Sequence, residues 1–416
     1  MKSGQKGSLA PLNCSICDQL ASAVSFSKIY SFRGSSISDG AVPLAGQVLA
    51  SDGNLYGTTF IGGANNLGTV FKISPTGTRP KIIHSFKGTA QGDGAGPWST
   101  LVEHNGFLYG TTTYGGSTLG GACSSFGIFG LNADGCGSAF SVNLATGAVQ
   151  TIATFPRVSG QPIFPSGGVT LGSDKKLYGV SNLSSFSEPP ILYSLTPSGA
   201  TTVTPKVLFV FSNDLIPVEA KIVEARTGVL FGTSAYSTTG ANKGLIYSIT
   251  TKGKNYKVLH TFIGGTDGDT PRTGLMKASN GKVYGTTLYG GSGPQGTIFK
   301  IEATGAGYKV LHSFTGAKGN IPYARLNQVG SLLYGTTMAG GSGPCPITNL
   351  FGINAAGCGT IYKMTLAGVV TPGIFSFKGT NGSYPAGTMV KQGTNVFGTT
   401  FAGGTLNLGT LFRFTP

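Results

Sequence analysis

The chain of 416 residues contains 69 glycines and 21 prolines, and 39% of its residues are hydrophobic while only 10% are charged. This composition is too apolar for a disordered chain, and no apolar run of about 20 residues is present that would cross a bilayer as a helix. Lysine and arginine exceed the acidic residues by 15 charges, a surplus that attracts polyanions such as acidic glycans, membrane surfaces or nucleic acid. Because glycine weakens helix interiors, we expect an all-β fold.

Residues 1–25 are predicted to be a leader or N-terminal extension, and residues 26–416 a single domain. The leader lacks the apolar segment of a secretory signal, so a signal has been removed or replaced, or export follows another route. The six cysteines form three short-range pairs, for which we predict the disulfides Cys14–Cys17, Cys123–Cys136 and Cys345–Cys358. Disulfides are typical of an oxidising compartment, so we expect a secreted or cell-surface protein.

A short phrase, LYGTT or a close variant, occurs seven times along the chain. Its aromatic residue recurs about every 50 residues, at Tyr56, Tyr109, Tyr178, Phe231, Tyr284, Tyr334 and Phe397. Two intervals are longer because insertions, residues 113–136 and 338–358, follow the second and sixth copies. The chain therefore consists of one unit repeated seven times, and two of the copies carry an insertion.

Each unit is predicted to contain four strands: a proline-led strand, the LYGTT phrase, a strand like GTVFKI (residues 68–73) and a strand like KIIHSF (residues 81–86). Four antiparallel strands in a unit of this length make one propeller blade. The last unit, ending in GTLFRFTP, lacks a fourth strand, whereas SKIYSF (residues 27–32) precedes the first unit. We therefore predict a seven-bladed β-propeller whose last blade is completed by a strand within residues 26–32.

The succession of LYGTT, GG, GTVFKI, HSF and a proline-led strand resembles the GloVer tandem repeat of exported and surface-anchored bacterial proteins. The resemblance covers residues 27–414 and implies a β-propeller. It implies no catalytic residues, because that repeat carries no assigned activity. The third unit departs most from the pattern, with Ser181 and Asn182 in place of the two threonines and Pro190 at the third-strand glycine.

Loops between the second and third strands and loops between blades should emerge on one side of the ring, here called the upper face. Both predicted disulfide-bearing insertions belong to this face, and they are similar, with FGIFGLNADGCGS in one and LFGINAAGCGT in the other. The disulfides are interpreted either as staples for long loops or as supports for the rigid walls of a ligand cleft.

The loops between blades supply most of the candidate binding residues. Residues that follow the loop prolines begin the innermost strands, so they are expected to point into the mouth of the channel. Aromatic rings stack on sugars and cations, and arginine binds carboxylate or sulfate through two parallel hydrogen bonds. The predicted ligand-binding residues are Trp98, Arg272, Tyr323, Arg325, Tyr384, Asp93 and Asp269. In the alternative interpretation, each aspartate is a turn residue and Trp98 is a buried contact between blades.

Histidine is the usual general base, but His84, His260 and His312 share one position in the fourth strand, where other units carry Ala153 or Phe209. This position is therefore interpreted as a packing position. The sequence also lacks HExxH, P-loop and GxSxG motifs and a cysteine–histidine cluster with zinc spacing, so no cofactor and no metal site is predicted.

Three functions stay open. The first, which we favour, is an exported, non-catalytic module that binds a glycan or polyanionic surface ligand across the upper face. The second is a secreted hydrolase or polysaccharide lyase acting at the channel mouth, with Asp214, Glu219 and Asp269 as candidate carboxylates by location. The third is a structural or interaction scaffold. Nucleic acid is not an expected partner because no Lys/Arg run is present, and we expect a monomer without a transmembrane segment.

Overall fold

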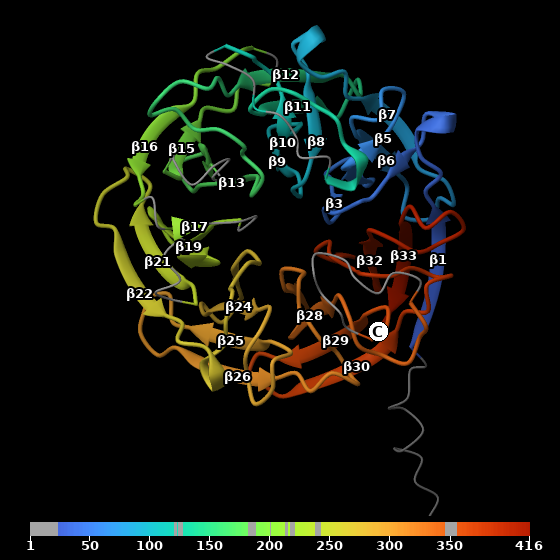
Figure 1. The fold of residues 1–416 in the computed structure, drawn as a ribbon, viewed down its shortest axis with the longest axis vertical. Helices are drawn as coiled ribbons and strands as arrows, with labels where there is room; N and C mark the ends of the chain where they lie inside the picture. The colour runs from blue at the N-terminus through green and yellow to red at the C-terminus, as the bar shows by residue number, and fades with distance from the viewer. Residues whose placement is uncertain are drawn as a thin grey trace, which may run out of the picture.

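The computed structural model describes residues 24–119, 123, 128–181, 189–199, 201–212, 215–216, 221–237, 243–345 and 356–416. Within these residues, seven antiparallel sheets stand around a central axis (Figure 1). The chain visits the sheets in order, and the first strand of each sheet lies nearest the axis while the fourth lies at the outside of the ring. The fold is an all-β, seven-bladed propeller, as predicted.

In blades 1 to 6 the strands follow one another in the sheet in chain order. Blades 1 and 2 contain β3 (Val48–Leu49), β4 (Leu55–Thr59), β6 (Thr69–Ile73) and β7 (Lys81–Ser85), then β9 (Val102–His104), β10 (Phe107–Gly115), β11 (Ser138–Asn143) and β12 (Val149–Thr154). Blades 3 and 4 contain β13 (Val169–Leu171), β14 (Leu177–Val180), β15 (Ile191–Leu195) and β16 (Lys206–Val210), then β18 (Val223–Arg226), β19 (Val229–Ser234), β21 (Leu245–Thr250) and β22 (Lys257–Thr261). Blades 5 and 6 contain β23 (Met276–Lys277), β24 (Val283–Thr287), β25 (Thr297–Ile301) and β26 (Lys309–Ser313), then β27 (Asn327–Val329), β28 (Leu332–Thr337), β29 (Thr360–Thr365) and β30 (Val370–Ser376).

Blade 7 contains strands from both ends of the chain. It consists of β31 (Val390–Gln392), β32 (Asn395–Thr400), β33 (Thr410–Thr415) and β1 (Ser25–Ser31). Strand β1 pairs antiparallel with β33, from Ser25 opposite Thr415 to Ser31 opposite Thr410. The predicted closure by the N-terminal strand is thus confirmed, and Figure 1 shows β1 at the outer edge beside β33.

Short elements lie in the loops. The strand β8 (Gly94–Pro97) pairs with the end of β10, β2 (Gly40–Ala41) pairs with β5 (Ile61–Gly62), and β17 (Leu215–Ile216) pairs with β20 (Tyr236–Ser237). The 3-10 helices are η2 (Ser35–Ile37), η3 (Thr89–Gln91), η4 (Ile128–Gly130) and η5 (Gly265–Asp267). No helix in the described part of the chain is long and apolar enough to cross a membrane.

The glycine of the repeated phrase is explained by an aromatic ring of the third strand. At Gly57, an added Cβ would come within 2.5 Å of Cζ of Phe71, a distance at which the ring would have to move. The same crowding occurs in every blade, between Gly110 and Phe140, Gly179 and Tyr193, Gly232 and Tyr247, Gly285 and Phe299, Gly335 and Tyr362, and Gly398 and Phe412. The phrase therefore requires glycine because the ring lies directly across its backbone.

The first threonine of the phrase connects neighbouring blades. The hydroxyl of Thr336 in blade 6 donates to the carbonyl of Pro385 in blade 7 at 2.9 Å. Across the junction between the chain ends, the hydroxyl of Thr399 donates to the carbonyl of Ala45 at the same distance. Blade 7 thus binds blade 1 through a hydrogen bond from the same threonine of the phrase, with an acceptor two residues after Pro43, the equivalent of Pro385. This bond helps to hold the first strands in one ring around the axis.

Candidate functional site

The loops predicted to share the upper face do lie together. In blade 1, β2 from the loop before the first strand pairs with β5 from the loop after the second strand. The two insertions end at equivalent places on this face, because the N–H of Phe164 donates to the carbonyl of Cys136 at 2.7 Å and the N–H of Tyr384 donates to that of Cys358 at 2.9 Å.

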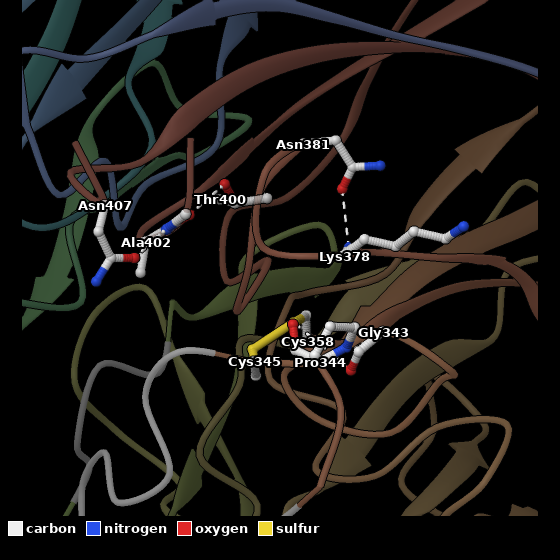
Figure 2. Close-up of a disulfide and its surroundings, with 10 residues drawn as sticks. Gly343, Pro344, Cys345, Cys358, Lys378, Asn381, Thr400, Ala402 and Asn407 are labelled. Carbon is white, nitrogen blue, oxygen red and sulfur yellow. Dashed lines mark hydrogen bonds between the residues drawn. A yellow bond between two sulfur atoms is a disulfide. The ribbon is translucent and has the colours of Figure 1, made fainter. Parts of the chain in front are cut away.

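Two of the three predicted disulfides join described residues. Cys123 is bonded to Cys136, and Cys345 to Cys358. Figure 2 shows the second disulfide close to Gly343. The predicted Cys14–Cys17 disulfide lies outside the described residues.

Buried side chains of the upper face form one hydrophobic cluster that spans six blades and includes residues of both insertions. Phe129, from the blade 2 insertion, lies 5.9 Å from the ring of Phe60 in blade 1 and 5.8 Å from that of Phe401 in blade 7. Cys345, from the blade 6 insertion, packs against the same cluster. The disulfide-bonded loops are therefore part of the packed upper face.

In contact with this cluster, which shares Leu44 and Ala386 with it, a cavity of about 100 Å³ lies on the axis. All seven blades contribute to it through the segments that lead into their first strands, and its lining residues are Leu44, Ala45, Gly46, Trp98, Ser99, Thr100, Ser166, Gly167, Lys221, Arg272, Thr273, Gly274, Tyr323, Arg325, Ala386, Gly387 and Thr388. Three of these described lining residues are basic and none is acidic. The electrostatic potential of this lining therefore favours a negatively charged group in the cavity.

Two of the cations occupy the same position of the repeat. In each blade the first strand places one residue opposite the aromatic of the phrase, as with Val223 opposite Phe231 and Asn327 opposite Tyr334. In each blade, the residue two places before this first-strand residue belongs to a ring around the axis. The ring consists of Gly46, Thr100, Gly168, Lys221, Gly274, Arg325 and Thr388. Five blades carry glycine or threonine there, and only blades 4 and 6 carry a long basic side chain.

The two basic side chains are anchored on main-chain carbonyls. The Lys221 ammonium donates to the carbonyl of Thr100 at 3.4 Å, and Nε of Arg325 donates to that of Leu275 at 2.7 Å. Burial and the neighbouring charge of Arg325 lower the pKa of Lys221 to about 7. Burial likewise lowers the pKa of Arg325 to about 10. Both shifts have the direction expected of cations withdrawn from water without a compensating anion.

The structure brings four of the predicted binding residues to this cavity. Trp98, Arg272, Tyr323 and Arg325 all line it and are all partly buried. The Arg272 guanidinium lies 5.9 Å from the centre of the Tyr323 ring, a cation–π contact. The Trp98 ring packs edge-on against Phe60 at 4.8 Å, so it also makes the contact between blades that the alternative interpretation proposed.

The other predicted binding residues do not line the cavity. Asp93 is 2.8 Å from Nε2 of His84 and accepts the backbone N–H groups of Lys87 and Gly94. Asp269 accepts the hydroxyl of Thr270 at 2.7 Å. Ligand-binding roles for these two residues stay predictions.

Tyr384, the remaining predicted binding residue, is buried and stacks on Phe401 at 5.3 Å. It also stays a prediction. The candidate carboxylates Asp214 and Glu219 lie outside the described residues. Among the residues that are described, no group of three or more His, Cys, Asp or Glu side chains is placed to hold a metal ion.

Sequence reasoning missed Lys221, because it considered the residues that closely follow each loop proline. Pro217 is one residue further from its strand than the other loop prolines, so Lys221 sits at the fourth place after it, while Arg325 sits at the third place after Pro322. Counting back from the phrase aromatic does not align the two cations either, because Lys221 lies ten residues before Phe231 and Arg325 nine before Tyr334. Only the strand pairing aligns them.

These features define a closed β-propeller of tandem repeats with a basic axial cavity beneath disulfide-bonded loops. The chain belongs to the Gloeobacter/Verrucomicrobia repeat family, whose model matches residues 19–132 and 129–345. This confirms the GloVer resemblance. No protein with curated annotation matches the sequence.

Some solved structures are similar to the chain at low sequence identity. The chain is similar to an oligogalacturonate lyase in complex with manganese, with a TM-score of 0.56 and 12% identity over 94% of this chain and 96% of that one. It is also similar to BamB from Moraxella catarrhalis, with a TM-score of 0.45 and 8% identity over 90% of this chain and 86% of that one. At such identities these similarities concern the fold alone.

Proposed function

We propose that this protein is an exported, non-catalytic binding module that recognises a glycan or other anionic surface ligand through the upper face of the propeller. The observation that carries the proposal is the axial cavity, where Lys221, Arg272 and Arg325 meet without an acidic residue among the described lining. Basic side chains that share a cavity repel one another, so an anion that enters relieves the repulsion as well as making its own hydrogen bonds.

The size of the cavity indicates which part of a ligand it takes. A volume of about 100 Å³ has room for one carboxylate or sulfate group. The remainder of the ligand would lie towards the aromatic rings of Trp98 and Tyr323, which line the same cavity and suit the apolar face of a sugar.

The surroundings of the site support an exported location. The two disulfides at the upper face are of the kind that persists outside the cytosol. Each joins cysteines 13 residues apart in sequence, which limits the conformational freedom of that insertion. We therefore place the protein outside the cell or at its surface.

A glycan array probed at two salt concentrations tests the proposal. We expect binding to acidic glycans that weakens with salt and that Arg325→Ala and Arg272→Ala each reduce, by about 10-fold or more, because a hydrogen bond to a charged group contributes about 1.5–3 kcal/mol. Lys309→Ala, which removes an exposed cation from the outer strand β26, is the matched control and should leave binding unchanged.

Three outcomes would contradict the proposal. Binding that resists salt and both arginine changes would place the ligand elsewhere. Equal loss in Lys309→Ala would show that only the net charge attracts the glycan. Release of unsaturated or reducing products from the bound glycans would show a lyase or hydrolase instead of a binding module.

A further inference from the structure

The ring position occupied by Lys221 and Arg325 is crowded by backbone. An added Cβ at Gly274 would lie 2.9 Å from Cβ of Lys221, and one at Gly46 would meet the backbone N of Thr388 at 2.7 Å. Small residues in the other blades therefore leave space on the axis for two long side chains, and both of these are basic. At this level of the cavity a ligand meets one ammonium and one guanidinium.

Both groups keep donors beyond those that anchor them. An ammonium has three N–H donors and a guanidinium five, whereas the anchoring bonds to Thr100 and Leu275 use one donor of each group. The anchors come from blades 2 and 5, so the two groups are held from different sides of the axis. Such preorganised donors suit a small oxyanion with several acceptor oxygens.

Among the described residues, the charged groups that line the cavity with Lys221 are of one sign. Arg325 from blade 6 and Arg272 from blade 5 line the same cavity, and the described lining includes no carboxylate. Glu224, on the strand that follows Lys221, instead accepts the backbone N–H groups of Ser173 and Gly228. Glu219 lies outside the described residues, so the experiment below includes a variant of it.

We infer that Lys221 and Arg325 form an axial subsite for one oxyanion group of the ligand, a carboxylate or a sulfate. The inference rests on the proposed function, because it names the part of the ligand that enters the cavity. No covalent bond is made: the neutral amine takes a proton from the solvent, and the resulting ammonium pairs with the oxyanion.

The size of the effect follows from the environment of the amine. With a pKa of about 7, Lys221 is about 90% neutral at pH 8 and about 10% neutral at pH 6. An anion beside the ammonium restores the pKa towards its ordinary value. Binding therefore takes up about 0.9 proton at pH 8 and about 0.1 at pH 6, and affinity falls about 10-fold from pH 6 to pH 8.

Isothermal titration calorimetry of the full chain with tetragalacturonate and, separately, with inorganic sulfate tests the inference. Titrations at pH 6 and pH 8, at constant ionic strength and in buffers of different ionisation enthalpy, count the protons taken up. The two probes distinguish a carboxylate subsite from a sulfate subsite. Proton uptake at pH 8 with either probe supports the inference.

Three variants assign the proton. Lys221→Arg stays charged at both pH values, so it should bind without proton uptake and without the 10-fold fall in affinity. Lys221→Gln should bind more weakly at pH 6 and take up no proton, and far-UV circular dichroism checks that both variants fold. Glu219→Gln should take up as many protons as the unaltered protein.

The outcomes separate the two proposals. Binding without proton uptake, or uptake that persists in Lys221→Arg or disappears in Glu219→Gln, overturns this inference and leaves the binding function intact. Failure of both probes to bind at pH 6 overturns the subsite, while salt-sensitive binding on the glycan array would still support the binding module.

Discussion

Phe32 offers a test of ring closure because its burial depends on the contact between the chain ends. It follows β1, is fully buried, and lies 5.6 Å from the ring of Phe71 in blade 1. Phe86 holds the equivalent place after β7, is also fully buried, and lies 5.2 Å from Phe140 in blade 2. Truncating a buried phenylalanine to alanine costs about 3–5 kcal/mol. In a closed ring, Phe32→Ala and Phe86→Ala should therefore cost the same.

Guanidinium unfolding measures this comparison. The fluorescence of Trp98, the single tryptophan, and far-UV circular dichroism report the transition, and their coincidence checks that one cooperative event is followed. Ile37→Ala, at a residue that is 50% exposed in the adjacent loop, is the control and should change stability by about 0.5 kcal/mol or less. If Phe32→Ala resembles this control while Phe86→Ala costs about 3–5 kcal/mol, then the N-terminal strand does not close the ring.

Three further predictions concern the repeat, the insertions and pH. Gly57→Ala should destabilise the folded protein by about 1–3 kcal/mol. Adding Phe71→Leu to that variant should recover part of the loss, because it removes the ring atoms that the new methyl group meets. A double-mutant cycle in which the two costs are strictly additive would refute the packing argument. Replacing Cys123 and Cys136 together by alanine should lower stability by about 3 kcal/mol and speed proteolysis of the blade 2 insertion; unchanged cleavage would contradict this. Burial lowers the pKa of His312. The stability that the neutral, buried imidazole contributes is therefore present above about pH 6.5 and is lost as the pH falls below that value. His312→Phe should make the unfolding midpoint less dependent on pH over this range, and an unchanged pH dependence would be contrary evidence.

Much of the fold was predictable because the same contacts recur around the ring. The phrase glycine faces an aromatic ring in every blade. Most phrase threonines bind the next blade or the third strand, as Thr59 does with Thr69 at 2.7 Å, whereas the hydroxyls of Thr58 and Thr233 have no partner among the described residues. Each contact is local in the unit or falls between neighbouring units, so the spacing of the phrase specifies the number of blades. The position of the unmatched strand at residues 27–32 then specifies how the ring closes.

The candidate site was only partly predictable, because it depends on register across the ring. Arg325 and Tyr323 could be found from their distance to a proline, whereas Lys221 is shifted by one residue in its blade and is recognised only from the pairing of Val223 with Phe231. The surroundings of Tyr384 were also beyond sequence reasoning, since its stacking on Phe401 joins two loops of blade 7. Part of the buried cluster on the upper face, including Cys123, Leu131 and Cys136, comes from an insertion that the repeat does not describe.

The most direct test of the account is the position of an anion in crystals of the protein. Crystals soaked in selenate, a heavier analogue of sulfate, would show its location by anomalous diffraction. We predict a selenium peak on the axis, in contact with Lys221 and Arg325, that is absent from crystals of the Arg325→Ala variant. Peaks confined to lysines of the outer strands, with the axial cavity holding water alone, would contradict an anion-binding function for this cavity.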